Sequence, residues 1–469
     1  MFLPQDKKIF KEIFVLSLPI ILSNLSRVLM SIADVAMVGR MGTEALAATG
    51  MGSMMFWGAL SLTMGIRTAV QTVTARRLGQ SLYKESGFAL RNGLVLASVY
   101  SIPMSIFVWF YSHNIVQFFI KDSVATPLTD DYVSILFIGL MFSSYSFVFQ
   151  GFFTGIEKTK VHMKVTIISN ILNVYLNAGF IYGSSEVRAF FIEHLPSLSF
   201  FAVIWDWFNF PALGVKGAAV ATLISSIWMT IHYSTSLFSK EIKQKFSIFD
   251  VSFNQDMMVK QIRLALPQGL QEFVIAFGWG VFYKIVGIIG LVELATTELL
   301  FTIMHASFMP ALGVGQACST LVSKYMGRGS PEVSEVSIKE SIRIAEYIMA
   351  PMGLSFILFP EQYLYIFTSD LEIINMGSYG LRIIGALQFI DAVAFVLWFA
   401  LSGAGNTFFP AMVEATLTWV VIVFGSYVVG VYFSLGFKAL WLLFPVHLGL
   451  FASILIWKTS QGDWKDIKV

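Results

Sequence analysis

The sequence predicts an all-α integral membrane protein, in which twelve transmembrane helices form two six-helix bundles related by a parallel pseudo-twofold repeat. Three observations lead to this fold class. The 469 residues are 56% hydrophobic and 13% charged, with a mean hydropathy of +0.73, whereas soluble domains carry about 25% charged residues. The apolar residues gather into twelve long runs. The second half of the chain also repeats the first.

Each predicted span is a run of about 20 mainly apolar residues, the length at which a helix crosses the hydrocarbon core. The first run follows the short basic stretch "MFLPQDKKIFKEIF" and has no A-x-A-like cleavage site. We therefore expect an uncleaved first span and not a signal peptide. The twelve runs lie at residues 9–38, 45–74, 87–111, 128–153, 161–182, 213–238, 259–288, 293–322, 338–360, 375–402, 409–432 and 437–458.

Basic residues predict how the chain is oriented. Of the 31 Lys and Arg residues, 22 fall in segments that face one side of the membrane. Cytoplasmic loops carry an excess of Lys and Arg, so we predict a plasma (inner) membrane protein with both termini in the cytoplasm. This orientation requires an even number of spans. The basic residues of the opposite side are Arg40, Lys121, Arg188, Lys216 and Lys438, and those within spans are Arg27, Arg67, Lys284 and Arg382.

The internal repeat has a shift of 248 residues. "LSLP" at 16–19 aligns with "LALP" at 264–267, and "VGRMGTEALAAT" at 38–49 aligns with "VGIIGLVELATT" at 286–297 with six identities. Because the period contains six spans, both halves enter the membrane in the same orientation, as in parallel repeats. The same shift aligns five further pairs: Gly65 with Gly313, Thr72 with Thr320, Gly79 with Gly327, Gly155 with Gly403, and Thr159 with Thr407.

The repeat sets the predicted domains: an N-lobe at 1–238, a cytoplasmic linker at 239–258 and a C-lobe at 259–469. After the fifth span the register changes, because "LGVKGAAVAT" at 213–222 resembles "LGFKALW" at 435–441 at a shift of 222. The first half therefore carries about 26 extra residues near 184–210, on the side opposite the basic loops. We expect an amphipathic or interfacial segment there, with a gate or lid as the alternative.

Several function classes are disfavoured. Cys318 is the single cysteine, so neither a disulfide framework within the chain nor a Cys/His metal motif is possible. A net charge of +2 gives no indication of a nucleic-acid surface. The loops are mostly short and hold no grouping of nucleophile, base and orienting residue, so we expect no enzyme. No filter-like repeat or charged ring indicates a channel.

Polar residues inside the spans are the candidate functional residues, because lipid cannot satisfy them and they usually face the bundle interior. Helical spacing places two sets on one face each: Asn24, Arg27, Ser31 and Asp34 in the first span, and Thr166, Asn170, Asn173 and Asn177 in the fifth. Later spans add Gln268, Gln271 and Glu272 after Pro267, then Glu298, Thr302 and His305, and finally Gln388 and Asp391.

Each candidate has a structural alternative. Asp34 lies six residues before Arg40, roughly 6–10 Å inside the boundary, and interfacial water or an Arg partner would explain it. The polar face of the fifth span, Thr166, Asn170, Asn173 and Asn177 (the Asn stripe), would also be explained by interhelical hydrogen bonds of ~0.6 kcal/mol each. We interpret Arg27 and Arg67 as counter-ions or snorkelling residues, and Glu298 as interfacial. The 248-residue shift places Phe282 opposite Asp34, so the fold does not require an acid there.

The order and spacing of several motifs resemble the MATE (multidrug and toxic compound extrusion) family of the MOP flippase superfamily. The resemblance covers essentially the whole chain. Its motifs are "SLP" and "ADVAMVGRMG" in the first span, "NILNVYLNAGFIYG" in the fifth, "LGVKGAAVAT" opening the sixth, "LPQGLQEF" opening the seventh and "IDAVAFVLWFALSGAGNT" in the tenth. The resemblance implies two lobes that rock around a central cavity and export amphiphilic organic cations in exchange for sodium ions or protons.

The resemblance also assigns residues. Asp34, 15 residues after Pro19, matches the acid associated with cation or proton coupling in the N-lobe, and Asn173 matches the asparagine of that site. Where the family commonly has an aspartate, this chain has Asn177. Asp391 matches a C-lobe acid implicated in cation binding in the NorM-like branch. That branch has a glutamate where this chain has Ile275, and the nearest acid is Glu272.

We therefore predict secondary active antiport. The N-lobe coupling site would be Asp34, Asn173 and Asn177, and the C-lobe cation or substrate site would be Glu272, Asp391 and Gln388, with Na⁺ held at Asp34 or Asp391 if sodium is the coupling ion. Pro19 would bend the first helix. We expect no cofactor besides H⁺ or Na⁺, a drug-like cation and the bilayer as partners, no nucleic acid, and a monomer. The alternative is a flippase or exporter of a lipid-linked or amphiphilic metabolite.

Overall fold

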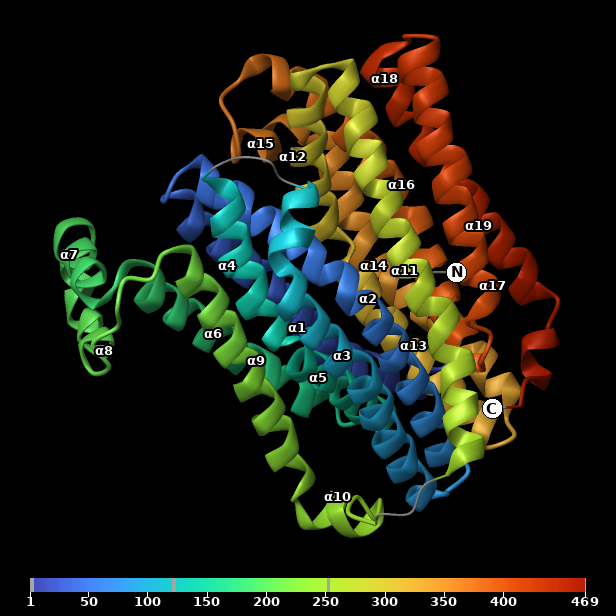
Figure 1. Ribbon diagram of the computed structural model, residues 1–469. Coiled ribbons are helices and arrows are strands. Elements are labelled where there is room, and N and C mark those ends of the chain that lie inside the picture. Colours follow the sequence, from blue (N-terminus) through green and yellow to red (C-terminus); the bar gives the residue numbers. More distant parts are fainter. Residues whose placement is uncertain (1–3, 120–123, 251–253, 469) are drawn as a thin grey trace.

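The computed structural model describes residues 4–119, 124–250 and 254–468, so Lys121 and positions 251–253 of the predicted linker lie outside the described residues. Helices follow one another throughout the described chain. In Figure 1 the first half, coloured blue to green, and the second half, coloured yellow to red, lie side by side as two bundles. The predicted all-helical membrane fold is confirmed.

The first half holds the long helices α1 (Lys7–Gly39), α2 (Thr43–Gly79), α3 (Tyr83–Phe119), α6 (Thr159–Tyr182) and α9 (Val215–Leu237), together with the pair α4 (Ala125–Ile138) and α5 (Leu140–Gly155). Helices α4 and α5 meet at Gly139 at an angle of 46°. The predicted fourth span is therefore a bent pair of helices. Short elements follow later in this half: α7 (Ser184–His194), η1 (Pro196–Ala202), α8 (Val203–Asp206) and α10 (Lys240–Lys245).

The second half holds α11 (Gln255–Ile289), α12 (Leu291–Ser307), α13 (Met309–Gly327), α14 (Pro331–Leu358), α16 (Leu371–Ala404), α17 (Phe408–Leu417), the π-helical segments η2 (Thr418–Phe424) and η3 (Tyr427–Tyr432), α18 (Gly436–Trp441) and α19 (Leu443–Ser460), with the short α15 (Pro360–Tyr365) and η4 (Asp463–Asp466). Within the described residues, 11 helical segments are long and apolar enough to cross a membrane, and the bent pair α4–α5 brings the number to 12.

Local sequence explains how the first helix of each half begins. The side chain of Asp6 accepts hydrogen bonds from the backbone N–H groups of Lys8 and Ile9, and that of Asn254 accepts one from Met257. These two N-caps stand 248 residues apart and satisfy donors that a helix start leaves free. Helices α1 and α11 each continue through their internal prolines, Pro19 and Pro267.

The contacts between the halves follow the same shift. Helix α2 packs on α11 as α13 packs on α1, and α2 meets α13 at the centre. A Cβ on Gly79 would lie 2.0 Å from the carbonyl oxygen of Lys324, and one on Gly327 would lie 2.2 Å from that of Arg76. Each close approach therefore has its counterpart 248 residues away. This reciprocity is what a parallel pseudo-twofold axis produces.

The halves are bonded together at the end where the basic loops lie. Gln71 donates to the Gln316 carbonyl (2.8 Å) and Ser323 donates to the Thr72 carbonyl (2.7 Å). The buried Lys324 ammonium contacts Glu12 (2.7 Å) and Glu157 (2.5 Å). These residues belong to the C-terminal half of α2, to the middle and the C-terminal half of α13 and to elements packed around them, so this conformation is closed at its basic end.

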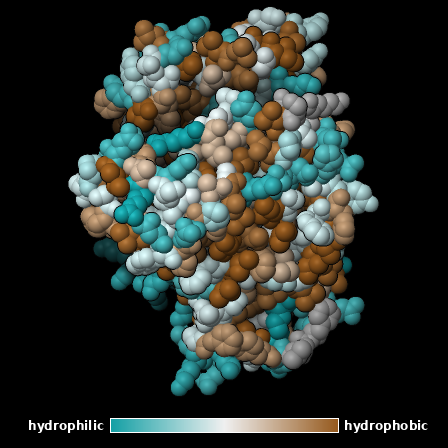
Figure 2. All heavy atoms as spheres, turned by 60° about the vertical axis from the view of Figure 1, so that its left-hand side comes forward, coloured by the Kyte–Doolittle hydropathy of each residue, from teal (hydrophilic) through white to brown (hydrophobic). Residues whose placement is uncertain are grey.

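The outer surface has the character expected in lipid. Figure 2 shows hydrophobic side chains through the middle of one face, with hydrophilic ones at its lower end and also over its left side and upper part. The extra segment near 184–210 forms α7, η1 and α8, which project from the side of the bundle in Figure 1. Its aromatic side chains Phe200, Phe201, Trp207 and Phe208 are exposed, in keeping with the interfacial segment that we predict.

Candidate functional site

The candidate site of the first half lies between α1 and α6. Asp34, half-buried on α1, accepts a hydrogen bond of 2.5 Å from the Nδ2 atom of Asn177 on α6. The same amide nitrogen lies 3.1 Å from the Oδ1 atom of Asn173, one turn earlier. The structure therefore brings together the three residues that the sequence predicts for this site, and the polar faces of the first and fifth spans do meet.

Further contacts fix the positions of these side chains. Asn173 donates to the Thr222 hydroxyl of α9 at 3.5 Å, and Asn170 donates to the Ser26 hydroxyl of α1 at 2.6 Å. The Oδ1 atom of Asn177 is buried and has no hydrogen-bond partner among the described residues. Carboxylate and amide oxygens such as those of Asp34 and Asn177 are ligands that hard cations accept.

A second polar group lies deeper in the N-lobe. Arg27 donates to the Oε1 atom of Gln150 at 3.4 Å and lies 5.5 Å from the ring centre of Phe147. The Nδ1 atom of His162 is 2.6 Å from the Tyr233 hydroxyl. Arg27 therefore has its own partners in this half, Gln150 and Phe147, and neither of these two interactions involves Asp34.

The candidate site of the second half is more dispersed. Glu272 on α11 and Asp391 on α16 are half-buried, and Arg67 of α2 attracts Glu272 electrostatically across the junction between the halves. Gln388 is fully buried and donates to the Ser307 hydroxyl at 2.9 Å. No hydrogen bond between Gln388 and either acid is found among the described residues.

Glu414 of α17 is a residue that the sequence reasoning missed. Its carboxylate lies near enough to Asp391 and Glu272 to be repelled by their negative charges. One of its oxygens lies 3.8 Å from the Nε2 atom of His447 on α19, and the other is buried without a hydrogen-bond partner among the described residues. Two signals would have found it. Glu414 is an ionisable residue inside a predicted span, and the 248-residue shift places it on Thr166, the first member of the Asn stripe.

The acids of both halves are poorly compensated. Within the described residues no Lys or Arg nitrogen lies within 4.0 Å of Asp34, Glu272, Asp391 or Glu414. Among the residues that the structure describes, no group of three or more His, Cys, Asp or Glu side chains is arranged to hold a metal ion. Burying a carboxylate without a cationic partner is costly, and intramembrane acids are the first candidates for a functional role.

A family model described as MatE matches residues 19–178 and 267–428, which together make up most of the chain. The two matches begin at Pro19 and Pro267, exactly one repeat shift apart. The chain belongs to the MATE family. It is therefore a transporter and not an enzyme.

Relatives of this MATE protein cover nearly its full length. The "Probable multidrug resistance protein NorM" of Thermotoga maritima is 26% identical over 99% of this chain and 95% of its own length. The protein of the same name from Brucella suis is 24% identical over 93% and 90%. A solved structure described as the outward-facing conformation of a multidrug resistance MATE family transporter of the MOP superfamily superposes with a TM-score of 0.86 at 21% identity, covering 98% of this chain and 97% of that one.

The two lobes of this MATE fold are not equivalent at the candidate sites. Phe282, the repeat partner of Asp34, is fully buried among Trp279, Phe301 and Phe444. Conversely, Glu272 corresponds by the same shift to Asn24, a buried neutral residue of α1. Each lobe therefore carries its acids where the other has neutral side chains, so the sites are specific to their lobes and are not consequences of the shared fold.

Proposed function

We propose that this MATE protein exports amphiphilic organic cations by antiport with H⁺ or Na⁺. The observation that carries the proposal is the presence, in both lobes, of membrane-embedded carboxylates without a Lys or Arg partner. A relative of similar length is named as a probable multidrug resistance protein. An antiporter needs a site that binds either the coupling ion or the substrate, but not both together. A membrane carboxylate without a Lys or Arg partner supplies such a site.

The N-lobe group would hold the coupling ion. Asp34 provides the charge, and the Asn177 and Asn173 amides, bonded to it in series, provide further oxygen atoms. With a proton as the coupling ion, burial would favour the neutral carboxyl group, because a low-dielectric environment disfavours the charged form. With Na⁺, the carboxylate and the unpartnered Asn177 oxygen would be ligands.

The C-lobe group would attract the organic cation. Glu272, Asp391 and Glu414 come from three helices and place up to three negative charges in one region. Arg67 and His447 are the positive or ionisable groups that act on this region. A cationic substrate would relieve the repulsion among the acids, and protonation would do the same, so the two ligands would compete.

Coupling further requires two conformations that bind the ligands with different affinity, because a ligand with equal affinity for both does not change their populations. The closed basic end, held by Lys324 and the paired glycines, would be one of the two states. Movement of one charge across the membrane contributes about 2.3 kcal/mol per 100 mV. Exchange of one monovalent organic cation for one coupling cation moves no net charge, so the concentration gradient of the coupling ion would drive such export. The membrane potential would contribute only if a second coupling cation entered in each cycle.

The test is ethidium transport in inverted vesicles, with a proton or a sodium gradient imposed separately. We expect coupled transport with one of the two gradients and its loss in Asp34→Asn. Asp391→Asn and Glu414→Gln should need a higher ethidium concentration for half-maximal transport. Glu372→Gln, an exposed acid on the same helix as Asp391, is the matched control and should behave as wild type. If Asp34→Asn and Asp391→Asn both retain gradient-driven transport, the proposed mechanism is wrong.

A further inference from the structure

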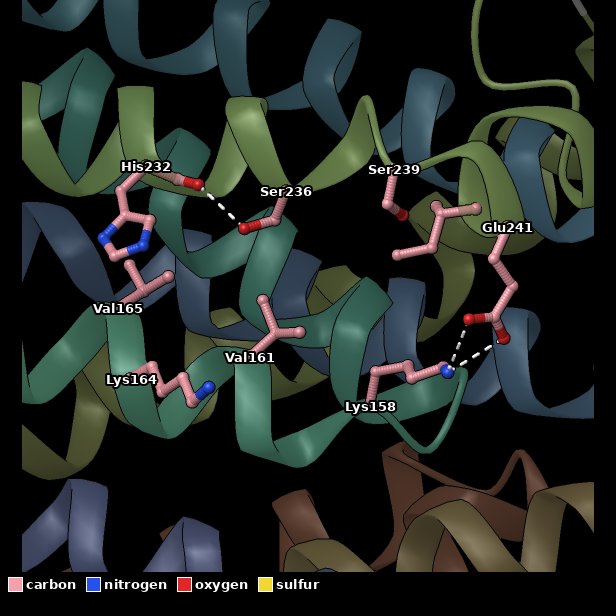
Figure 3. A pocket seen from close by; sticks show the side chains of 9 residues that line it. Lys158, Val161, Lys164, Val165, His232, Ser236, Ser239 and Glu241 are labelled. Carbon is pink, nitrogen blue, oxygen red and sulfur yellow. Dashed lines mark hydrogen bonds and ion pairs between the residues drawn. The ribbon is translucent and has the colours of Figure 1, made fainter.

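A groove at the basic end of the N-lobe lies apart from both candidate sites. It has a volume of about 350 Å³ and lies between α6 and α9, beside the short helix α10. In Figure 3 the α9 side chains face those of α6 across the opening, and Glu241 of α10 closes one end. The groove is lined by Lys158, Val161, Lys164, Val165, His232, Ser236, Ser239, Glu241 and Ile242.

The lining follows helical spacing. Lys158, Val161 and Lys164 recur every three residues at the start of α6, and His232 and Ser236 are four residues apart at the end of α9. Residues at these separations share one helical face. Two neighbouring helices therefore turn matched faces toward each other, which places cationic and hydrogen-bonding groups on opposite walls.

The charges of the groove are only partly balanced. Lys158 contacts both carboxylate oxygens of Glu241, at 2.9 and 3.1 Å, and its ammonium group holds the pKa of Glu241 below the usual range. These two charges therefore neutralise each other at neutral pH. Lys164 is exposed and has no ion-pair partner among the described residues. The groove thus retains one uncompensated cation.

His232 supplies a second group that suits an anion. Its imidazole points from α9 toward α6 in Figure 3, and its Nδ1 atom is buried without a hydrogen-bond partner in the described part of the chain. The Ser236 hydroxyl already donates to the His232 carbonyl at 2.9 Å. Besides the Ser239 hydroxyl, two donors of the lining remain, the imidazole and Lys164. Phosphate is an anion that accepts from both.

The faces that form the groove continue toward the membrane centre as apolar surface. Ile168 and Ile171 follow Lys164 by four and seven residues on α6 and are 44% and 65% exposed. On α9, Trp228 precedes His232 by four residues, is 44% exposed, and has its ring centre 6.2 Å from that of His232. One ligand lying along both surfaces would need a charged end and a long apolar part.

We propose that this groove binds the phosphate headgroup of an anionic phospholipid. Lys164 and His232 would contact the phosphate, and the acyl chains would lie along Ile168, Ile171 and Trp228. Basic pockets between transmembrane helices on the cytoplasmic side are suited to such headgroups, and positive charges collect on this side of the chain. A soluble phosphate would contact only the basic end of the groove, whereas a phospholipid would also contact the adjoining apolar strip.

Native mass spectrometry of the full-length protein tests the proposal with phosphatidylglycerol and phosphatidylcholine of identical acyl chains. We expect wild type to bind one phosphatidylglycerol at least fivefold more tightly than phosphatidylcholine. The variants Lys164→Gln and Lys164→Gln/His232→Gln should each lose most of this preference. Lys160→Gln removes the same charge from an exposed position on α6 that does not line the groove, and it should keep the preference.

Two results would overturn the proposal. If Lys160→Gln loses as much preference as Lys164→Gln, the attraction is a diffuse effect of the basic loops and not a site. If soluble glycerol phosphate displaces phosphatidylglycerol at equal concentration, the groove recognises phosphate without the acyl chains. Melting temperatures of all variants in detergent are measured alongside, and the single Lys164→Gln substitution, at an exposed residue, keeps the test available if the double variant unfolds.

Discussion

Replacing Lys324 should shift this transporter away from the conformation that is closed at its basic end. The Lys324 side chain is 8% exposed, and its ammonium group contacts Glu12 at 2.7 Å and Glu157 at 2.5 Å, whose side chains are 24% and 26% exposed. Lys324→Met keeps the apolar stem and removes the charge. Glu12 retains one partner, the Tyr325 hydroxyl at 2.7 Å.

The expected magnitude follows from this geometry. Removing one partner of a fully buried ion pair costs about 3–5 kcal/mol. Because both glutamates reach water, the loss here should be smaller, about 2 kcal/mol, still above the ~0–1 kcal/mol of exposed pairs. If these contacts are broken when the basic end opens, about 2 kcal/mol changes the ratio of closed to open molecules roughly 30-fold, since 1.4 kcal/mol corresponds to a factor of ten.

Electron–electron distance measurements between spin labels at Leu82 and Glu332, exposed near the basic ends of the two lobes, report this ratio. The single native cysteine, Cys318, is buried, which simplifies site-specific labelling. Lys339→Met is the matched control, because its 2.7 Å contact with Glu335 is exposed. The reasoning is refuted if Lys324→Met leaves the distance distribution unchanged, or if Lys339→Met shifts it equally.

Three further outcomes are expected. Gly79→Ala should lower the melting temperature, because the new Cβ would lie 2.0 Å from the Lys324 carbonyl oxygen and overpacking costs about 1–3 kcal/mol. Gly58→Ala on the same helix, where a Cβ would have nothing within 4 Å, should be neutral or stabilising. Equal melting curves for the two variants would contradict this. Asn177→Ala removes the donor to Asp34, a charge-assisted hydrogen bond of about 1.5–3 kcal/mol that favours the ionised carboxylate. If the coupling ion is a proton, its concentration for half-maximal transport should therefore fall about tenfold or more; if it is Na⁺, which also loses the amide oxygen as a ligand, that concentration should rise. Asn170→Ala should leave the value within twofold. Deleting residues 185–209 should reduce partitioning into lipid bilayers during reconstitution without changing substrate affinity; a changed affinity would instead indicate a gate.

The candidate sites were only partly predictable from the sequence. Asp34, Asn173 and Asn177 were found because helical spacing gathers polar residues on single faces, and the structure places those faces together. Gln388 was grouped with Asp391 because both are polar residues of the tenth predicted span, yet its amide bonds to Ser307 on another helix. Spacing fixes a residue's direction around its own helix but not the neighbour that it meets. Glu414 was missed because it stands alone in its span, and only packing brings it near Asp391 and Glu272.

The sequence by itself determined the membrane class, the number and order of spans and the parallel repeat. These properties depend on apolar length and on one register shift, and both can be read along a single dimension. The tertiary structure alone decided which polar faces meet, that the basic end is closed by Lys324 and the paired glycines, and that α6 and α9 form a basic groove. Those features depend on side chains from helices far apart in the chain, whose separation is set by packing in three dimensions.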